Sequence, residues 1–260
     1  MATYAVGDIH GCFSEWIALK DKIEAQDKDA KFILVGDIID RGQETLDMLD
    51  WAIENVTDNG KYQMILGNHE SEKIDWKNRF LKQLIDQADK KGIDPIDLLC
   101  EYNDRYNFVF LHKIEIEYED NPLDCLVKHI EWMETLPLFK DIAIDGKRFI
   151  IAHANIPKSM LLSDGTLKKD VTDHEKQYII WDRSIQAKNV IPDSIMVYGH
   201  TPTVLYHEDG IKIDNPGRIH VNKLHNKYNI DCGLVYKQYY PEATLAALNL
   251  NTLEEIYLHD

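Results

Sequence analysis

The feature that most constrains this chain is an apolar run that stops abruptly at charged residues and glycines. Residues 32–35 are wholly apolar, which indicates a buried strand of a parallel sheet. The next seven residues are Gly36-Asp37-Ile38-Ile39-Asp40-Arg41-Gly42. A rigid sheet positions whatever the loop after a strand carries, so a strand that ends in charge is typical of an active site. Taken alone, the same residues also suit an ordinary Asp/Gly turn.

This arrangement recurs, and the recurrence argues against ordinary turns. We expect strands at 4–6, 32–35 and 62–66, with a helix over 14–25 capped by Ser14 and another over 43–54. The β-α-β-α-β order predicts parallel strands and right-handed crossovers, which place the first three polar loops at one sheet edge. Two further polar loops follow apolar strands later in the chain. The five loops carry Asp8 and His10; Asp37, Asp40 and Arg41; Asn68 and His69; His153; and His200.

The remaining patterns predict an insertion and a second sheet. Residues 71–137 read as a mostly helical insertion, with one apolar helical face formed by Leu81, Leu84, Ile85 and Ala88, another helix starting at Pro95, and a third ending before Pro137. Closely spaced strands are predicted at 147–152, 195–198, 211–213, 219–221, 229–230, 243–250 and 252–258, as in an antiparallel or mixed sheet. We therefore predict an α/β fold: one domain over residues 1–260, a four-layer α/β/β/α sandwich of two mixed β-sheets.

Composition restricts the function. The formal net charge is -16 and the sequence pI is near 5.1, so the surface repels nucleic acid and anionic lipid. It also repels phosphorylated substrates unless cations or arginines reverse the local field. Four cysteines lie far apart and form no CxxC pair, which favours reduced thiols in a cytoplasmic protein. We expect no signal peptide before Asp8, and no apolar run approaches the ~20 residues of a membrane span.

The donors of the five loops predict a metal site. Carboxylate, amide and imidazole ligands suit borderline divalent ions such as manganese, iron, zinc or nickel. The set contains no thiolate, so a structural zinc site of the sulfur type is not expected. It holds more ligands than one ion needs, which favours two ions sharing one carboxylate, about 3.5–4 Å apart.

The motif series resembles a known family. Asp8-Ile9-His10, Gly36-Asp37 through Asp40-Arg41-Gly42, Gly67-Asn68-His69-Glu70, His153-Ala154 and Gly199-His200 are similar to the successive motifs of the phosphoprotein phosphatase family, one of the calcineurin-like metallophosphoesterases. The motifs span residues 7–202. The second and third are long near-literal matches, whereas the fourth and fifth gain weight from their order.

The resemblance implies a role for each residue. Asp8, His10 and Asp37 would bind one metal ion, and Asp37, Asn68, His153 and His200 the other, with Asp37 bridging. His69, paired with Asp40, would protonate the leaving oxygen. Arg41 would bind phosphate oxygens together with Asn68. Direct attack of a metal-bound hydroxide, with no phosphoenzyme, would follow, and manganese is the ion expected in vitro.

Two features lie outside the strongest motifs. A second phosphate-binding arginine is expected at Arg183, which follows the apolar Ile179-Ile180, with Arg218 as the weaker candidate. The family often has glycine after the fourth-motif histidine, whereas this chain has Ala154-Asn155, which leaves substrate contacts in that loop open. The Asp231-Gly233 stretch reads as a structural turn beneath the site.

The resemblance leaves three functions open. The first is a soluble metal-dependent phosphatase acting on phosphoserine or phosphothreonine in proteins, with phosphotyrosine and small phosphoesters also within reach. The second is a symmetrical bis(5'-nucleosyl)-tetraphosphate hydrolase, which shares the motifs. The third is a catalytically silent scaffold, which the presence of the whole ligand set disfavours. The patterns do not determine the oligomeric state.

Overall fold

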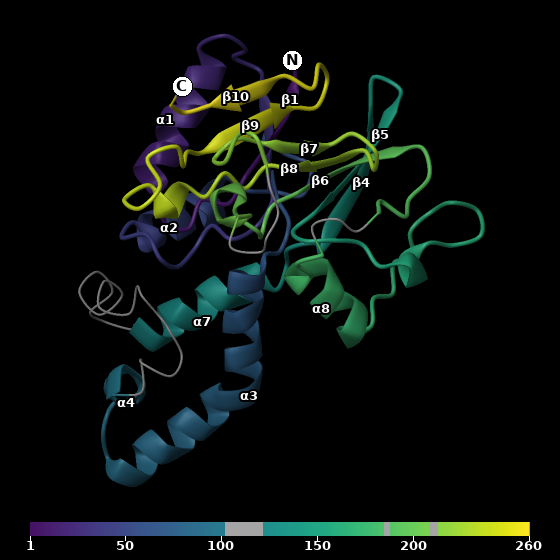
Figure 1. Ribbon diagram of the computed structural model, residues 1–260. Helices are drawn as coiled ribbons and strands as arrows, with labels where there is room; N and C mark the ends of the chain where they lie inside the picture. The colour runs from purple at the N-terminus through teal and green to yellow at the C-terminus, as the bar shows by residue number, and fades with distance from the viewer. Residues whose placement is uncertain (102–121, 185–187, 208–212, 260) are drawn as a thin grey trace.

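Two five-stranded sheets pack face to face in the computed structural model, which describes residues 1–101, 122–184, 188–207 and 213–259 (Figure 1). The strands of the first sheet, in spatial order, are β10 (Glu255–Tyr257), β9 (Ala246–Asn249), β1 (Thr3–Val6), β2 (Lys31–Leu34) and β3 (Tyr62–Met64). Those of the second sheet are β4 (Phe139–Ile144), β5 (Lys147–Ala152), β6 (Ser194–Tyr198), β8 (Lys227–Asn229) and β7 (His220–Asn222).

Both sheets are mixed, as predicted. Strands β1, β2 and β3 run parallel, and β9 pairs antiparallel with β1. In the second sheet β5, β6 and β8 run parallel, whereas β4 and β7 are antiparallel neighbours at the two edges. Parallel strands bring their carboxyl ends to one edge of a sheet, so the loops after them converge.

Side-chain alternation along the strands creates the layers. Along β2 and Val35, which follows it, side chains alternate between two cores. Phe32 and Leu34 point to the outer core, between the first sheet and its helices, whereas Ile33 and Val35 point to the core between the two sheets. Helices α1 (Phe13–Glu24) and α2 (Thr45–Asn55) bury their apolar faces in the outer core, and α8 (Asp173–Trp181) covers the far face of the second sheet. The predicted α/β/β/α sandwich is therefore confirmed.

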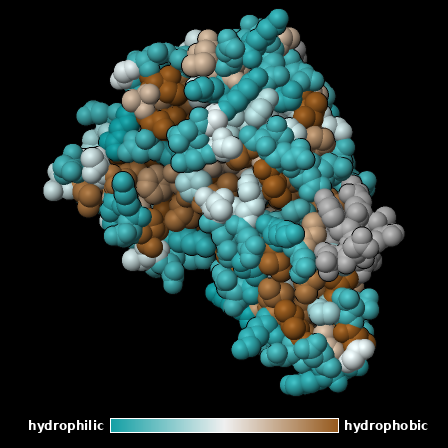
Figure 2. Space-filling model, turned by 180° about the vertical axis from the view of Figure 1, so that it is seen from behind, coloured by the Kyte–Doolittle hydropathy of each residue, from teal (hydrophilic) through white to brown (hydrophobic). Residues whose placement is uncertain are grey.

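The insertion contains three described helices: α3 (Asn68–Lys91), α4 (Pro95–Glu101) and α7 (Pro122–Met133). Helix α3 runs away from the sandwich as an arm (Figure 1). Leu84 and Ala88 are buried as predicted, but Ile85 is 36% exposed, which corrects the predicted face. Figure 2 shows apolar side chains on the back face of this arm. The 102–121 part of the predicted insertion lies outside the described residues.

Some local predictions were wrong. Helix α1 begins at Phe13 with Cys12 as its N-cap, so Ser14 is not the cap; its hydroxyl donates instead to Glu44 Oε1 at 2.5 Å. Neither β4 nor α8 was predicted from the sequence patterns. The strands predicted over 243–250 and 252–258 are shorter, and that at 211–213 lies outside the described residues except for Ile213, which is in no strand.

Short 3₁₀ helices complete the described elements: η1 (Lys158–Met160), η2 (Thr203–Leu205) and η3 (Leu234–Tyr236). None of the four cysteines, all of which lie in the described ranges, forms a disulfide there. None of the helices in the described ranges combines the length and the apolar character that crossing a bilayer requires.

An aromatic cluster fixes β2 against the outer helices. The Phe32 ring is fully buried and lies 5.5 Å from Trp16, 5.5 Å from Tyr62 and 5.9 Å from Tyr4, between ring centroids. Such pairs add to the stabilisation that burial alone provides. The cluster holds the strand whose carboxyl end carries Asp37.

Removing the central ring should destabilise the fold. We expect Phe32→Ala to lower the free energy of unfolding by about 3–5 kcal/mol, because transfer and cavity costs add. Tyr239, which is 71% exposed, is the matched aromatic control, and Tyr239→Ala should change that free energy by no more than about 0.5 kcal/mol. Urea unfolding followed by tryptophan fluorescence measures both; equal effects would contradict the role of the cluster.

Candidate active site

The five polar loops meet at one edge of the sandwich. Asp8 and His10 follow β1; Asp37, Asp40 and Arg41 follow β2; Asn68 and His69 begin α3; His153 follows β5; His200 follows β6. All of these except Arg41 are buried. The structure thus brings together residues up to 192 positions apart, as in the hydrogen bond from the His200 backbone N–H to Asp8 Oδ2 at 3.0 Å.

The backbone of these loops is strained. Residues with left-handed φ between 48° and 69° include His10, Asp37, Asp40, Arg41 and His200. Non-glycine residues adopt this region at a cost of order 1–3 kcal/mol each, and they cluster at functional sites. Gly36, at φ 97°, lies so close to Gly67 that a Cβ on it would be 2.6 Å from the Gly67 backbone. Close packing of the two loops therefore requires a glycine here.

Three histidines are oriented in the same way. Each hydrogen-bonds a backbone carbonyl through one ring nitrogen: His10 Nδ1 with Ile39 O (3.0 Å), His153 Nδ1 with Val35 O (2.8 Å) and His200 Nε2 with Trp181 O (3.3 Å). With that nitrogen donating its proton, the other is left with a lone pair directed into the site. A carbonyl behind the ring is the usual support of a metal-ligating histidine.

Asp37 lies at the centre of the site. Its Oδ2 is 3.3 Å from His153 Nε2 and 3.7 Å from His10 Nε2. Its Oδ1 accepts the backbone N–H of His69 at 3.0 Å. Asn68 Oδ1 is 2.9 Å from His153 Nε2 and 2.8 Å from His200 Nδ1. Two groups of donors that could each hold a metal ion share Asp37, namely His10-Asp37-His69 and Asp37-His153-His200.

The protonation states fit a cation site. Burial acts to raise the pKa of Asp37, but His153 and His69 outweigh it and hold that pKa well below its usual range. Burial lowers the pKa of His10 to about 3 and, together with His153, that of His200 to about 2, so both rings are neutral. Asp37 outweighs burial at His153 and raises its pKa to about 10. A cation bound here displaces that proton, because ligating imidazole must be neutral.

Asp8 supplies a further indication of a cation. Its Oδ1 is buried and has no hydrogen-bond partner in the described chain. Burial, and then Asp231, raise the pKa of Asp8 well above its usual range. A buried carboxylate oxygen left unpaired is costly unless a cation or a proton compensates it. Asp8 lies outside the two groups named above, but the donor set as a whole fits divalent ions.

His69 differs from the other three rings. Its Nδ1 bonds the Asp40 carboxylate at 2.8 Å rather than a carbonyl, and Lys73 Nζ lies 2.9 Å from the same Asp40 oxygen. Burial acts to lower the pKa of His69, but Asp37 and Asp40 outweigh it and raise that pKa. A carboxylate that stabilises imidazolium makes histidine a proton donor near neutral pH. Its Nε2 faces Arg41 Nη2 at 3.3 Å.

Two residues of the site have roles that the sequence patterns did not assign. Glu70 is fully buried and accepts the backbone N–H groups of Asp37 (2.9 Å), Ile38 (3.0 Å) and Gly67 (3.1 Å). It thereby fastens the loop after β2 to the start of α3. Tyr236 hydrogen-bonds Arg41 Nη1 through its hydroxyl at 2.5 Å. Only the position of Glu70 directly after His69 hinted at its role.

Arg183, the expected second arginine, lines the cavity at the site. With His10, Asp37, Arg41, Asn68, His69, His200, Pro202, Leu205 and Tyr236 it surrounds a cavity of about 150 Å³. Asp182 shapes the turn that carries it, accepting Ser184 N–H at 3.2 Å and Asn155 Nδ2 at 2.9 Å. Asn155, whose role was open, therefore ties the loop after His153 to the Arg183 turn.

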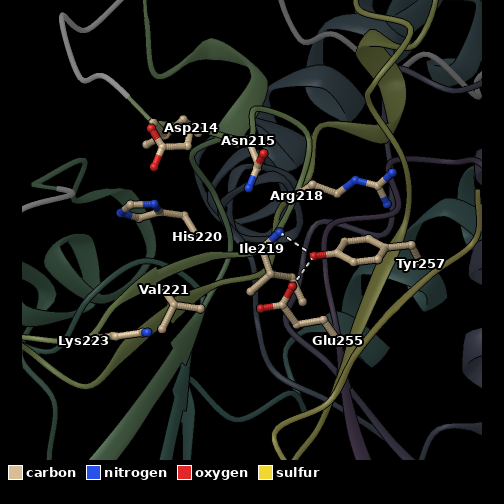
Figure 3. Close-up of a pocket in the computed structure, with 10 residues that line it drawn as sticks. Asp214, Asn215, Arg218, Ile219, His220, Val221, Lys223, Glu255 and Tyr257 are labelled. Atoms are coloured by element: carbon tan, nitrogen blue, oxygen red, sulfur yellow. Dashed lines mark hydrogen bonds between the residues drawn. The ribbon is translucent and has the colours of Figure 1, made fainter. Parts of the chain in front are cut away.

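Arg218, the weaker candidate, does not line this cavity. Its guanidinium lies 4.4 Å from the ring centroid of Tyr257. Figure 3 shows both residues at a separate hollow, where the Ile219 N–H donates to the Tyr257 hydroxyl at 3.1 Å. Since β10 and β7 are edge strands of different sheets, this contact ties the two sheets together.

The comparisons with known proteins agree with this geometry. The calcineurin-like phosphoesterase family model matches residues 1–232, which shows that the chain belongs to this family of metal-dependent phosphoesterases. Symmetrical bis(5'-nucleosyl)-tetraphosphatases from Methylobacillus flagellatus and Buchnera aphidicola are each 41% identical over 70 residues, which is 27% of this chain. The aligned segment spans only 24% of those curated relatives.

Solved structures extend the likeness to the whole fold. A metallophosphoesterase from Sphaerobacter thermophilus superposes with a TM-score of 0.51 at 14% identity, over 99% of this chain and 87% of that one. A mutant cold-active protein tyrosine phosphatase gives a TM-score of 0.54 at 15% identity, over 99% of this chain and 80% of that one. At such identities these likenesses show the shared fold alone.

A buried lysine beneath the Arg183 turn leads to a prediction about pH. Lys227 is 1% exposed and donates to Asn155 Oδ1 at 3.3 Å. Burial, opposed in part by Asp182, lowers its pKa to about 8, whereas an unfolded lysine titrates near 10.4. Between these values the unfolded chain binds a proton that the folded chain does not, so this group makes stability rise with pH.

Substitution isolates that contribution. We expect the free energy of unfolding of the parent to rise from about pH 8 to about pH 10.5 relative to that of Lys227→Met, which cannot titrate. Urea unfolding of both proteins at pH 7, 9 and 10.5 gives the difference. A difference that stays constant with pH would show that Lys227 has an ordinary pKa.

Proposed function

We propose that the protein hydrolyses phosphomonoesters at a centre of two divalent cations, with phosphoserine or phosphothreonine in proteins as its substrate class. The observation that carries this proposal is the sharing of Asp37 between two groups of buried donors, one of which includes His69, the ring that bonds Asp40. Two cations, when bound, neutralise the phosphate and lower the pKa of coordinated water. Manganese is the ion expected in vitro, with iron, zinc or nickel as alternatives.

The ligand assignment follows the family resemblance, with Asp8 in the place that His69 takes in the first group of donors. We assign Asp8, His10 and Asp37 to one ion, and Asp37, Asn68, His153 and His200 to the other. The carbonyl bonds of the three histidine rings fix the nitrogen that each presents. Glu70 holds the Asp37 backbone, so the bridging carboxylate keeps its place without help from the substrate.

His69 and the arginines act on the ester itself. Arg41 and Arg183, which both line the cavity, grip the phosphate oxygens. As water oxygen bonds to phosphorus and the ester P–O bond breaks, His69 gives its Nε2 proton to the leaving oxygen. Asp40 holds the ring and stabilises its charge. Asn68 lies in the same cavity and serves both a cation and the phosphate.

Two substrate classes have support. The cavity of about 150 Å³ is smaller than the ~300–1,000 Å³ of sites that enclose whole ligands, so it suits one phosphoryl group with the rest of the substrate outside. The net charge of -16 also disfavours a polyphosphate, which carries several negative charges. The small cavity and the negative charge therefore both favour a phosphoprotein as substrate. The 41% identity with symmetrical tetraphosphatases over 70 residues favours a dinucleoside tetraphosphate.

We place the enzyme in the cytoplasm, where reduced cysteines are the rule.

Two substitutions separate proton donation from metal binding. His69→Asn should lower kcat for a phosphoserine peptide by about 10²–10⁴-fold, with a smaller loss for p-nitrophenyl phosphate, whose leaving group needs little protonation. Bound manganese should be unchanged. Asp37→Asn should lose activity and metal together. Steady-state rates and metal analysis of the purified proteins measure both; loss of metal in His69→Asn would make His69 a ligand instead.

A direct comparison decides between substrates. With manganese present, we expect kcat/KM for a phosphoserine peptide to exceed that for diadenosine tetraphosphate, because the cavity encloses one phosphoryl group. The reverse order would establish the nucleotide activity. Absence of hydrolysis of either substrate, and of p-nitrophenyl phosphate, with every divalent ion tried would favour a silent scaffold.

A further inference from the structure

A second hollow lies near the catalytic cavity. A cleft of about 540 Å³ separates α3 from α8, with Ser71, Glu72 and Asp75 on one wall and Asp173 and Trp181 on the other. Glu72 places a carboxylate oxygen within 4.8 Å of a His69 ring nitrogen. The Trp181 ring packs edge-on against His200 at 6.0 Å between centroids. Each wall of the cleft therefore includes a residue that lies next to the active site: Glu72 beside His69, and Trp181 beside His200.

The position of the cleft matches the path of the leaving group. His69 is the proton donor of the proposed reaction, so the leaving oxygen must face it. The residues that follow His69 on α3 are the ones that form the near wall. A substrate whose phosphorus lies in the cavity therefore extends its leaving group toward α3 and the cleft.

Ser71 indicates that the cleft is built for a polar ligand. It is 1% exposed, and its hydroxyl has no hydrogen-bond partner in the part of the chain that the structure describes. An unpaired buried hydroxyl costs free energy that a ligand group can recover. Ser71 borders the cleft with its hydroxyl covered, so a peptide carbonyl or N–H that enters there pairs with it once the neighbouring side chains move aside.

The charges of the cleft select between ligands. Glu72, Asp75 and Asp173 outnumber the two cations of its walls, Arg79 and Lys176. Arg79 lies 3.8 Å from Asp75, so these two charges offset each other and leave Glu72 and Asp173 against Lys176. In a chain of net charge -16, this leaves a negative field, which attracts basic side chains and repels the extra phosphates of a nucleotide.

We propose that the cleft between α3 and α8 binds the leaving-group side of the substrate as a peptide segment with basic residues next to the phosphorylated one. This inference rests on the proposed phosphatase function. Ser71 pairs with the peptide backbone, Trp181 provides an apolar wall, and Asp75 and Asp173 face the basic side chains. The phosphate stays with Arg41 and Arg183.

Two phosphoserine peptides test the charges. They differ only in carrying arginines or glutamates beside the phosphoserine. Since an exposed ion pair changes affinity by up to about fivefold, we expect kcat/KM to favour the basic peptide by about tenfold. In Asp75→Asn/Asp173→Asn the preference should fall to about twofold or less. Glu54→Gln, an exposed substitution on α2, is the control and should keep the full preference.

Ser71→Ala tests the cleft independently of charge. Because the hydroxyl lacks a partner in the described chain, its removal should not lower Tm. It should nevertheless raise KM for the basic peptide severalfold, and more than KM for p-nitrophenyl phosphate. A merely structural serine would show the opposite: a lower Tm and equal effects on both substrates.

The outcomes separate the two proposals. Hydrolysis of p-nitrophenyl phosphate with manganese, but equal kcat/KM for both peptides in parent and variants, overturns the cleft and leaves the phosphatase in place. The same conclusion holds if kcat/KM for diadenosine tetraphosphate exceeds kcat/KM for both peptides and is unchanged in Asp75→Asn/Asp173→Asn. Absence of p-nitrophenyl phosphate hydrolysis with any divalent ion overturns the phosphatase function itself.

Discussion

One buried negative charge organises this molecule. Asp37 is 2% exposed and ionised, and three imidazole rings are arranged around its carboxylate. An isolated charge at such a depth would cost several kcal/mol, so the surrounding structure must supply compensation. Cationic imidazole supplies part of it through His153. A divalent ion supplies more, which links the stability of this region to the occupancy of its metal sites.

The second constraint is backbone strain, which the sandwich supports. Five residues of the site adopt left-handed φ, a cost that persists only where packing leaves no alternative. Glu70 contributes to that packing, because its carboxylate accepts three backbone N–H groups from two loops. Its pKa is raised to about 7, by burial and then by Asp37. The loops are thus held before any ligand arrives, which is what electrostatic preorganisation requires.

The sequence predicted the parts whose signal is local. Apolar runs followed by Asp, His or Asn located the strand ends, and β-α-β order placed them on one edge. It missed α8 although the Thr172–Glu175 capping box is a local signal, because few apolar residues follow the cap, and those buried are Ile179 and Ile180. It also missed what depends on tertiary contacts. Tyr236 and Asn155 act through partners 195 and 27 residues away, which no periodicity reveals.

Helix α3 links the proposed chemistry to the proposed substrate cleft in this chain. The proposed phosphoester hydrolysis uses the five loops of the sandwich, one of which runs into the first turn of α3. The same helix continues outward, so one rigid element carries both His69, the proposed proton donor, and a wall of the α3–α8 cleft. A side chain one or two turns along α3 therefore keeps a fixed distance from the leaving oxygen. Substitutions there can alter substrate preference without disturbing the cation ligands, which is how a common fold acquires distinct specificities.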